Sequence, residues 1–249
     1  KLFWIENTGH VPDKTASLVS ANSDLSKNWG VTLALESNAS DLTYGFSNPA
    51  LSPDQSMVYF TYYKLEEVRG NKTFNEGALY AHNASDGSPA WSYHIGPMDN
   101  LGKVMVGSDG TIYVGSSYGL TDPYGTPPPA YPTVYAINPN GTLKWSHTFS
   151  GTDYYATLEA LGSDRIFGTV TDDSSYSKVF ALNLTDGSVL WKNNVNFYSD
   201  ASSADIADGS DSFFSVPAIS SGTSSTTIQK LDSNGNIKWG INYPAAGDV

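Results

Sequence analysis

Val134-Tyr-Ala-Ile-Asn-Pro-Asn-Gly-Thr-Leu-Lys-Trp145 is a stretch that the chain repeats, and this repeat decides the fold. Glycine lies four residues before tryptophan in this copy and in three others, Leu79-Tyr-Ala-His-Asn-Ala-Ser-Asp-Gly-Ser-Pro-Ala-Trp91, Val179-Phe-Ala-Leu-Asn-Leu-Thr-Asp-Gly-Ser-Val-Leu-Trp191 and Ile228-Gln-Lys-Leu-Asp-Ser-Asn-Gly-Asn-Ile-Lys-Trp239. A weaker copy, Leu18-Val-Ser-Ala-Asn-Ser-Asp-Leu-Ser-Lys-Asn-Trp29, has Leu25 in place of the glycine. A period of roughly 45 to 60 residues indicates a propeller or an array of similar units.

Residues 102–148 show what one repeat contains. Short apolar segments at 102–107, 111–115, 133–137 and 142–146 predict four antiparallel strands, which we call A to D. Asn-Gly and Asp-Gly pairs in the turns favour tight hairpins, because glycine adopts a positive φ at no steric cost. The same order can be followed through 46–93, 156–193 and 204–241, with strand B at 57–60, 165–168 and 212–215. The first repeat begins with strand B at 2–5 and lacks strand A.

A single four-stranded sheet cannot bury both of its faces, so we predict an all-β propeller whose sheets pack face to face as blades. Residues 1–249 are expected to form one such domain. The repeats end near Trp29, Trp91, Trp145, Trp191 and Trp239. We expect these tryptophans to dock between neighbouring sheets, where the ring is buried and the indole N–H reaches a backbone carbonyl. Carbohydrate stacking is the functional alternative for them.

Composition narrows the class of partner. The chain of 249 residues has a formal net charge of -12 and no basic patch, which argues against nucleic acid and anionic membranes. It has no cysteine, so neither disulfides nor cysteine-based metal sites can hold the fold. No apolar run is long enough to span a bilayer, and we expect a mature or trimmed product without an anchor.

The repeats resemble the PQQ-like, or quinoprotein-type, β-propeller repeat and its tryptophan docking motif. Ala81 to Trp91, Ala136 to Trp145 and Ala181 to Trp191 match the motif well, and Lys230 replaces the alanine in the last copy. The resemblance implies one of two uses, enzymatic in quinoprotein dehydrogenases and scaffolding in BamB-type assembly lipoproteins. The chain lacks the enzymes' vicinal cysteines and any assignable calcium ligands. It is therefore closer to the scaffolds, and we expect no enzyme activity and no cofactor.

The number of repeats leaves the closure of the propeller open. Family propellers generally have about seven or eight blades, whereas this chain supplies about five repeats. We favour a fragment of a longer propeller, because an incomplete first blade would leave unpaired backbone groups at the channel. The alternative is pairing of the open ends with another chain, which would make the protein a structural subunit of an extracellular polymer.

Other motifs that can carry chemistry are interpreted as structural. Gly115-Ser-Ser-Tyr-Gly119 matches G-x-S-x-G, but the proline-rich residues after it cannot form the helix that a nucleophile elbow needs. Metal-ligand spacing is absent from the four histidines, His10, His82, His94 and His147. The aspartates of the loops could ligate calcium, but none has EF-hand spacing, and we interpret them as solvated turn residues: Asp172, Asp173, Asp205, Asp208 and Asp211. We therefore expect no metal site.

N-x-S/T sequons make glycosylation a hypothesis for a secreted chain. They occur at Asn38, Asn71, Asn83, Asn140 and Asn183. We expect Asn83, Asn140 and Asn183 to lie exposed on the turns between strands C and D, which favour asparagine in any case.

The position of the insertions gives the functional prediction. Residues 63–77, 116–132 and 169–177 all join strand B to strand C, and in a propeller these loops emerge on one face. The loop with Tyr118, Tyr124 and Tyr131 is the preferred contact surface, and a rigid cover over a blade edge is the alternative. We predict a non-catalytic extracellular or cell-surface scaffold, periplasmic in a Gram-negative bacterium, that binds a protein or a glycan through this face. Fold analogy alone keeps a degenerate quinoprotein-type enzyme as another alternative.

Overall fold

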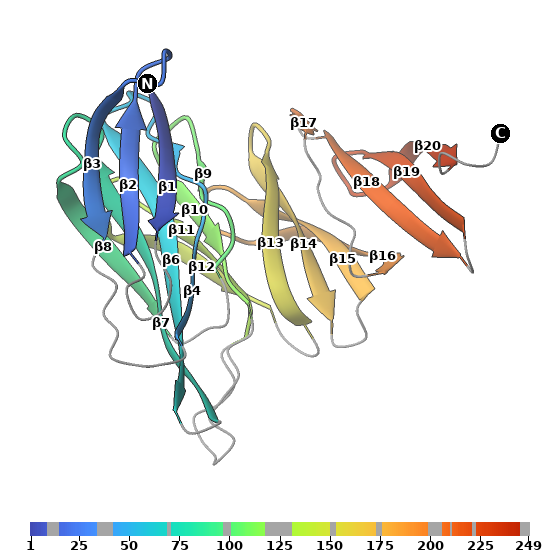
Figure 1. Cartoon of the computed structure of the whole chain (residues 1–249). Coiled ribbons are helices and arrows are strands. Elements are labelled where there is room, and N and C mark those ends of the chain that lie inside the picture. Colours follow the sequence, from blue (N-terminus) through green and yellow to red (C-terminus); the bar gives the residue numbers. More distant parts are fainter. Residues whose placement is uncertain are drawn as a thin grey trace. The chain divides into compact units, whose positions relative to one another are not determined.

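The computed structural model describes residues 1–8, 15–33, 42–68, 71–96, 101–117, 131–149, 153–172, 176–198, 206–209, 211–220 and 223–244. The chain divides into two compact units (Figure 1), one formed by Lys1–Ala130 and Tyr135–Lys144 and the other by Tyr131–Val134 and Trp145–Val249. The expectation of one domain over residues 1–249 stays a prediction.

The first sheet has three antiparallel strands in the order β1 (Leu2–Thr8), β2 (Thr15–Ala21) and β3 (Lys27–Leu33). Leu2 pairs with Ala21 and Thr8 with Thr15 across the β1–β2 hairpin. The described residues thus supply strands B, C and D of the first repeat without a strand A, as the sequence predicts.

The second sheet contains β4 (Leu42–Phe46), β5 (Ala50–Leu51), β6 (Met57–Val68), β7 (Asn71–Asn83) and β8 (Pro89–Gly96). Both β4 and β5 pair with β6, so strand A is split into two short pieces. The third sheet has the order β12 (Leu143–Thr148), β11 (Thr133–Ile137), β10 (Ile112–Gly115) and β9 (Met105–Val106). These strands confirm the blade predicted at 102–148.

The last two sheets each have four antiparallel strands. The fourth contains β13 (Asp153–Leu161), β14 (Arg165–Asp172), β15 (Tyr176–Asn183) and β16 (Val189–Tyr198). The fifth contains β17 (Ile206–Asp208), β18 (Asp211–Ser220), β19 (Thr223–Leu231) and β20 (Ile237–Pro244). Every assigned element is a strand in the described part of the chain, which confirms the all-β class and its antiparallel blades.

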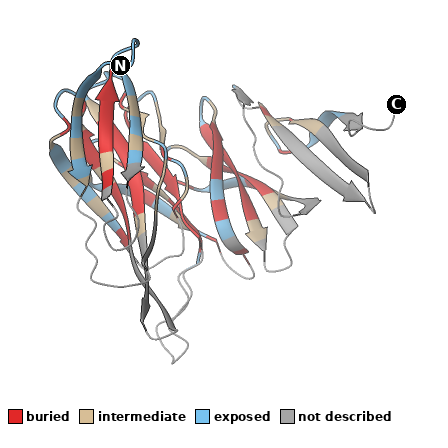
Figure 2. Ribbon diagram, in the orientation of Figure 1, coloured by how far each residue is buried: buried red, intermediate tan, exposed pale blue. Residues whose placement is uncertain are grey.

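Successive side chains of β6 pack against two different neighbouring sheets. Val58 and Phe60 pack in a cluster with Leu18 of the first sheet, whereas Tyr59, between them, packs with Ile112 of the third sheet. Successive side chains of a strand point to opposite faces, so one strand supplies both interfaces. Buried residues accordingly run along the strands of the first unit (Figure 2). This face-to-face burial is the packing that the repeat predicts.

The prediction that residues 63–77 and 169–177 are loops is wrong. β6 and β7 remain paired from Met57↔Asn83 to Val68↔Asn71, so most of the first insertion is a long hairpin. β14 and β15 likewise pair as far as Thr171↔Ser177. An insertion between two antiparallel strands can continue their hydrogen bonding, which satisfies the backbone groups that a loop would leave to water.

Candidate functional site

Four tryptophans make the same contact with the following repeat. The indole N–H of Trp29 donates to Ala84 O at 3.3 Å, and that of Trp91 donates to Pro139 O at 3.0 Å. The acceptors are Leu184 O for Trp145, at 2.9 Å, and Ser233 O for Trp191, at 3.1 Å. In each case the acceptor lies in the turn between strands C and D of the next sheet, so the ring and the turn form one recurring unit.

The motif glycine leaves the space that each of these rings occupies. Gly87, Gly141, Gly187 and Gly235 have φ between +72° and +84°. A Cβ atom added to Gly141 would lie 2.8 Å from the ring of Trp91. The same atom on Gly235 would lie 2.6 Å from the ring of Trp191. These glycines therefore meet two needs, a left-handed backbone and room for an indole.

Carboxylates close several turns of the repeats. The hydroxyl and backbone N–H of Ser188 donate to Asp186 Oδ1, and they lower the pKa of Asp186. The backbone N–H and hydroxyl of Ser88 act in the same way on Asp86. Asn140 holds the equivalent place in the third copy and accepts hydrogen bonds from Thr142. The sequence signal for these turns is Asp or Asn two residues before Ser or Thr.

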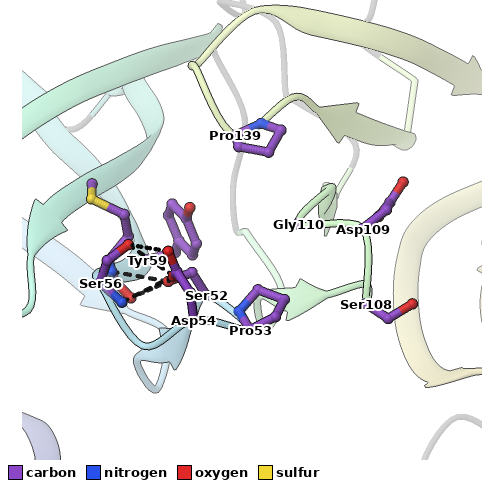
Figure 3. A pocket seen from close by; sticks show the side chains of 10 residues that line it. Ser52, Pro53, Asp54, Ser56, Tyr59, Ser108, Asp109, Gly110 and Pro139 are labelled. Carbon is purple, nitrogen blue, oxygen red and sulfur yellow. Dashed lines mark hydrogen bonds between the residues drawn. The ribbon is translucent and has the colours of Figure 1, made fainter.

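A pocket of about 290 Å³ lies at the start of β6 (Figure 3). Its lining includes Pro53, Asp54, Met57, Tyr59, Asp109 and Pro139. Met57 and Tyr59 belong to β6, and the other residues come from the A-to-B turns of the second and third repeats and from the C-to-D turn of the third. Sequence reasoning missed this pocket, because its walls are separated by up to about 85 residues of chain and each turn looks ordinary by itself.

Both carboxylates of the pocket are ionised at neutral pH. Hydrogen bonds from the hydroxyl of Ser52 and from the N–H and hydroxyl of Ser56 lower the pKa of Asp54 to about 2. Burial acts to raise the pKa of Asp109, but hydrogen bonds from Thr111 and Lys144 outweigh it, and the pKa is lowered. Such weak bases cannot take up a proton near pH 7. The pocket therefore carries negative charge and can attract a positive group.

The predicted contact face lies at the other end of β6. Figure 1 shows the β6–β7 hairpin extending past its neighbours. β8 pairs with β7 from His82 only as far as Gly77, so residues 71–76 of β7 pair with β6 alone among the described strands. Twelve strand residues span about 36 Å, which separates this tip from the pocket. The long hairpin is a feature that the sequence did not reveal.

Of the predicted contact tyrosines, Tyr131 is 37% exposed and lies two residues before β11. Tyr118 and Tyr124 lie outside the described residues. Ser116 forms an isolated bridge with Leu101, and both Ser116 and Ser117 are buried at the end of β10. Their burial gives no support to an exposed nucleophile in the G-x-S-x-G match.

The sequons differ in accessibility. Asn140 is exposed, but Asn83 and Asn183 are half-buried, so the expectation of three exposed sites is wrong for two of them. The amide of Asn83 donates to Ser88 Oγ at 2.8 Å, and Asn183 Oδ1 accepts from the N–H of Thr185. These side chains close their turns, which explains their burial. Asn71 begins β7, and Asn38 lies outside the described residues.

The histidines and aspartates that the structure describes do not gather into a metal site. Across the described ranges, no group of three or more His, Cys, Asp or Glu residues could hold a metal ion. His82 is buried and its Nδ1 lies 2.8 Å from Gly87 O. Asp211 forms ion pairs with Lys230 and Lys238. His10, Asp173 and Asp205 lie outside the described residues. The other histidines and aspartates singled out from the sequence lie in separate strands, His94 in β8, His147 in β12, Asp172 in β14 and Asp208 in β17.

No helix in the described part of the chain has the length and apolar character needed to cross a bilayer.

Comparison with known proteins identifies a family and a fold. Residues 70–234 match the family model described as outer membrane protein assembly factor BamB. None of the curated proteins compared with the chain matches it. Similar solved structures include a Bacteroides caccae protein of unknown function, with 13% identity over 96% of this chain and 93% of that one and a TM-score of 0.40. BamB from Moraxella catarrhalis has 14% identity over 92% and 72% of the two chains, with a TM-score of 0.39. Prolyl oligopeptidase B from Galerina marginata has 9% identity over 99% and 34%, with a TM-score of 0.51, which indicates a shared fold alone.

Proposed function

Because this chain belongs to the family described as outer membrane protein assembly factor BamB, we propose that it is a non-catalytic scaffold that binds a protein partner outside the cytoplasm. The family takes its description from a factor that assembles outer membrane proteins. The described residues fit a binding role better than a catalytic one, since their turn carboxylates are held as ions by hydrogen bonds. Neither carboxylate of the pocket, Asp54 or Asp109, has a pKa near neutrality.

The observation that carries the proposal is the β6–β7 hairpin. It continues for twelve residues of β6, and among the described side chains the core clusters take Met57 to Phe60 of its first half. A paired hairpin has its own backbone hydrogen bonds satisfied and can hold a binding surface away from the core. We propose that a protein partner contacts this hairpin, and that Tyr118, Tyr124 and Tyr131 of the β10–β11 connection belong to a contact surface as well.

The experiment compares two ends of the same strand. In the test variant, residues 65–75 are replaced by Asn-Gly, which joins Lys64 to Glu76 through a two-residue hairpin turn. The matched control, Asp109→Asn, changes the pocket and leaves the hairpin intact. The intact chain, the shortened variant and the control are each used to capture partners from an extracytoplasmic fraction. Mass spectrometry then identifies the captured proteins, and each one is purified and titrated against the three forms.

The expected result is a purified partner that binds the intact chain and the control but loses at least tenfold in affinity for the shortened variant. Loss of binding with Asp109→Asn instead would place the interaction at the pocket and contradict the hairpin proposal. If the chain binds immobilised glycans and no captured protein binds it in titration, the partner is a glycan and the proposal of a protein partner is wrong.

Secretion is tested separately. We propose an extracellular or cell-surface location, and the exposed Asn140 is the accessible sequon of the described turns. Intact mass of the natively produced protein, with Asn140→Gln beside Asn83→Gln, should show glycan loss only for the first variant in an organism that glycosylates. Recovery of the native protein from the cytoplasm would contradict the location.

A further inference from the structure

The pocket at the start of β6 contains a buried hydroxyl without a hydrogen bond. Tyr59 lines this pocket and is only 1% exposed. Its ring packs on Trp91 at 5.8 Å, and the charge of Asp54 acts on its hydroxyl. No described residue exchanges a hydrogen bond with that hydroxyl. Because buried polar groups normally have a hydrogen-bond partner, the hydroxyl marks a position that a ligand in the pocket can satisfy.

The carboxylate of Asp54 keeps one oxygen with spare capacity beside this hydroxyl. Oδ1 accepts from the hydroxyl of Ser52 at 2.6 Å and from the N–H and hydroxyl of Ser56 at 3.0 and 2.8 Å. Among the described residues, Oδ2 accepts from the hydroxyl of Ser56 alone, at 2.9 Å. Each carboxylate oxygen has two lone pairs, so Oδ2 can accept another donor. Figure 3 shows Asp54 and Tyr59 next to each other at one side of the pocket.

The second carboxylate of the pocket is already paired with a cation. Asp109 Oδ2 lies 3.2 Å from Lys144 Nζ and accepts from the hydroxyl of Thr111. In Figure 3 the carboxylate of Asp109 points away from Tyr59. Asp54, by contrast, forms no ion pair with a described residue. The negative charge that remains to balance a ligand is therefore that of Asp54.

The other walls of the pocket are apolar and are held in place by a docking tryptophan. Pro53, Met57 and Pro139 line the pocket. The indole N–H of Trp91 donates to Pro139 O at 3.0 Å, and its ring packs on that of Tyr59, so one side chain supports two walls. A volume of about 290 Å³ lies at the small end of ligand pockets. The pocket thus suits a side chain with an apolar stem and a positive end.

We propose that this pocket binds the ammonium group of a lysine side chain from another protein, with Asp54 Oδ2 and the Tyr59 hydroxyl as its acceptors. An ammonium makes single hydrogen bonds to separate acceptors, whereas the planar fork of a guanidinium needs both oxygens of one carboxylate, and Oδ1 of Asp54 is already taken. A protein is the favoured source, because Pro53 and Pro139 at the rim are exposed and can receive a side chain whose backbone stays outside. The site goes beyond the proposed function, since it is a second surface apart from the hairpin.

The test uses a single lysine side chain as its probe. Nα-acetyl-lysine N-methylamide is titrated into the intact chain, and NMR shifts of the Met57 backbone N–H report binding in the pocket. The corresponding norleucine amide has a similar stem without the ammonium. Asp54→Asn and Tyr59→Phe remove the two acceptors, and Tyr59→Phe keeps the buried ring. The matched control is Asp186→Asn, because Asp186 is held by equivalent hydrogen bonds from Ser188 and does not line the pocket. Circular dichroism checks that each variant is folded.

The lysine probe should bind at least about tenfold more tightly than the norleucine probe, with a dissociation constant of millimolar order. Asp54→Asn should weaken binding about tenfold and Tyr59→Phe about threefold, because each removes one acceptor. Asp186→Asn and the shortened hairpin should leave the affinity unchanged, so this proposal and that of the hairpin can fail separately.

Equal binding of the two probes would overturn the ammonium site, and unchanged affinity in Tyr59→Phe would overturn the role of its hydroxyl even if Asp54→Asn does not fold. Tighter binding of the corresponding arginine amide would overturn the choice of lysine. At least tenfold tighter binding of 1,5-diaminopentane would assign the pocket to a free amine and overturn the protein source.

Discussion

The first C-to-D turn and the four later ones all place a left-handed residue four positions before tryptophan, but that residue is leucine in the first turn and glycine in the others. Leu25 and the four motif glycines all have positive φ. A left-handed backbone therefore forms with or without glycine, at a steric cost when a side chain is present. Only the turns that receive a tryptophan carry glycine, and there the indole fills the place of the missing Cβ. The comparison teaches that the motif glycine is required by the neighbouring sheet more than by its own turn.

The largest loss of stability is expected from removing a tryptophan ring that packs on the turn of the next sheet. Trp145 is buried against the turn of Gly187, so Trp145→Ala should lower the free energy of unfolding by about 3–5 kcal/mol. Trp239→Ala is the matched control and should lower it by about 1 kcal/mol, because its ring is 41% exposed. Denaturant unfolding followed by circular dichroism measures both. Equal losses would show that the contact with the next turn contributes little.

A smaller loss of stability is expected from placing a side chain in the space that the motif glycine leaves for a tryptophan ring. Gly141→Ala places a Cβ 2.8 Å from Trp91 and also keeps a positive φ. These two costs together should destabilise the protein by about 2–4 kcal/mol. Gly209 is the control, since it too has a positive φ but a Cβ there would meet nothing within 4 Å. Gly209→Ala should lower the free energy of unfolding by about 1 kcal/mol. If the two substitutions lower it equally, the contact with the Trp91 ring does not contribute to the effect.

The reverse change at the first turn should stabilise the chain. Leu25→Gly relieves the strain of a branched side chain at φ of +66° and gives up little burial, because Leu25 is 71% exposed. The expected gain is about 1 kcal/mol, reduced by the greater freedom of glycine in the unfolded chain. A rise of a few degrees in the melting temperature is the measurable sign. A lower melting temperature would show that the leucine side chain makes a stabilising contact despite its exposure.

These contrasts mark what could be predicted from sequence. The spacing of Gly141 and Trp145 fixed the strand order of the third sheet, because both turns and strands repeat in register. The length of the β6–β7 hairpin was missed, since the mixed residues of 64–76 show no alternation that favours a strand. The burial of Asn83 was also missed, because its amide closes a turn with Ser88, five residues along the chain. Leu25 was noticed as a departure, but its meaning depends on its φ and on the rings at the other turns.

The smallest effect concerns the carboxylates that close the turns. Hydrogen bonds from the hydroxyl and backbone N–H of Ser26 lower the pKa of Asp24, and the same groups of Ser188 lower the pKa of Asp186. A carboxyl whose pKa is depressed by folding adds stability above its unfolded pKa of about 4, and this stability is lost as the pH falls toward the folded value. Carboxyl NMR titration should place both residues below 3.8. Leu25→Gly should leave the titration of Asp24 unchanged, because Ser26 and not residue 25 supplies the donors. A shift of Asp24 toward its ordinary pKa in that variant would mean that the leucine side chain holds the turn closed.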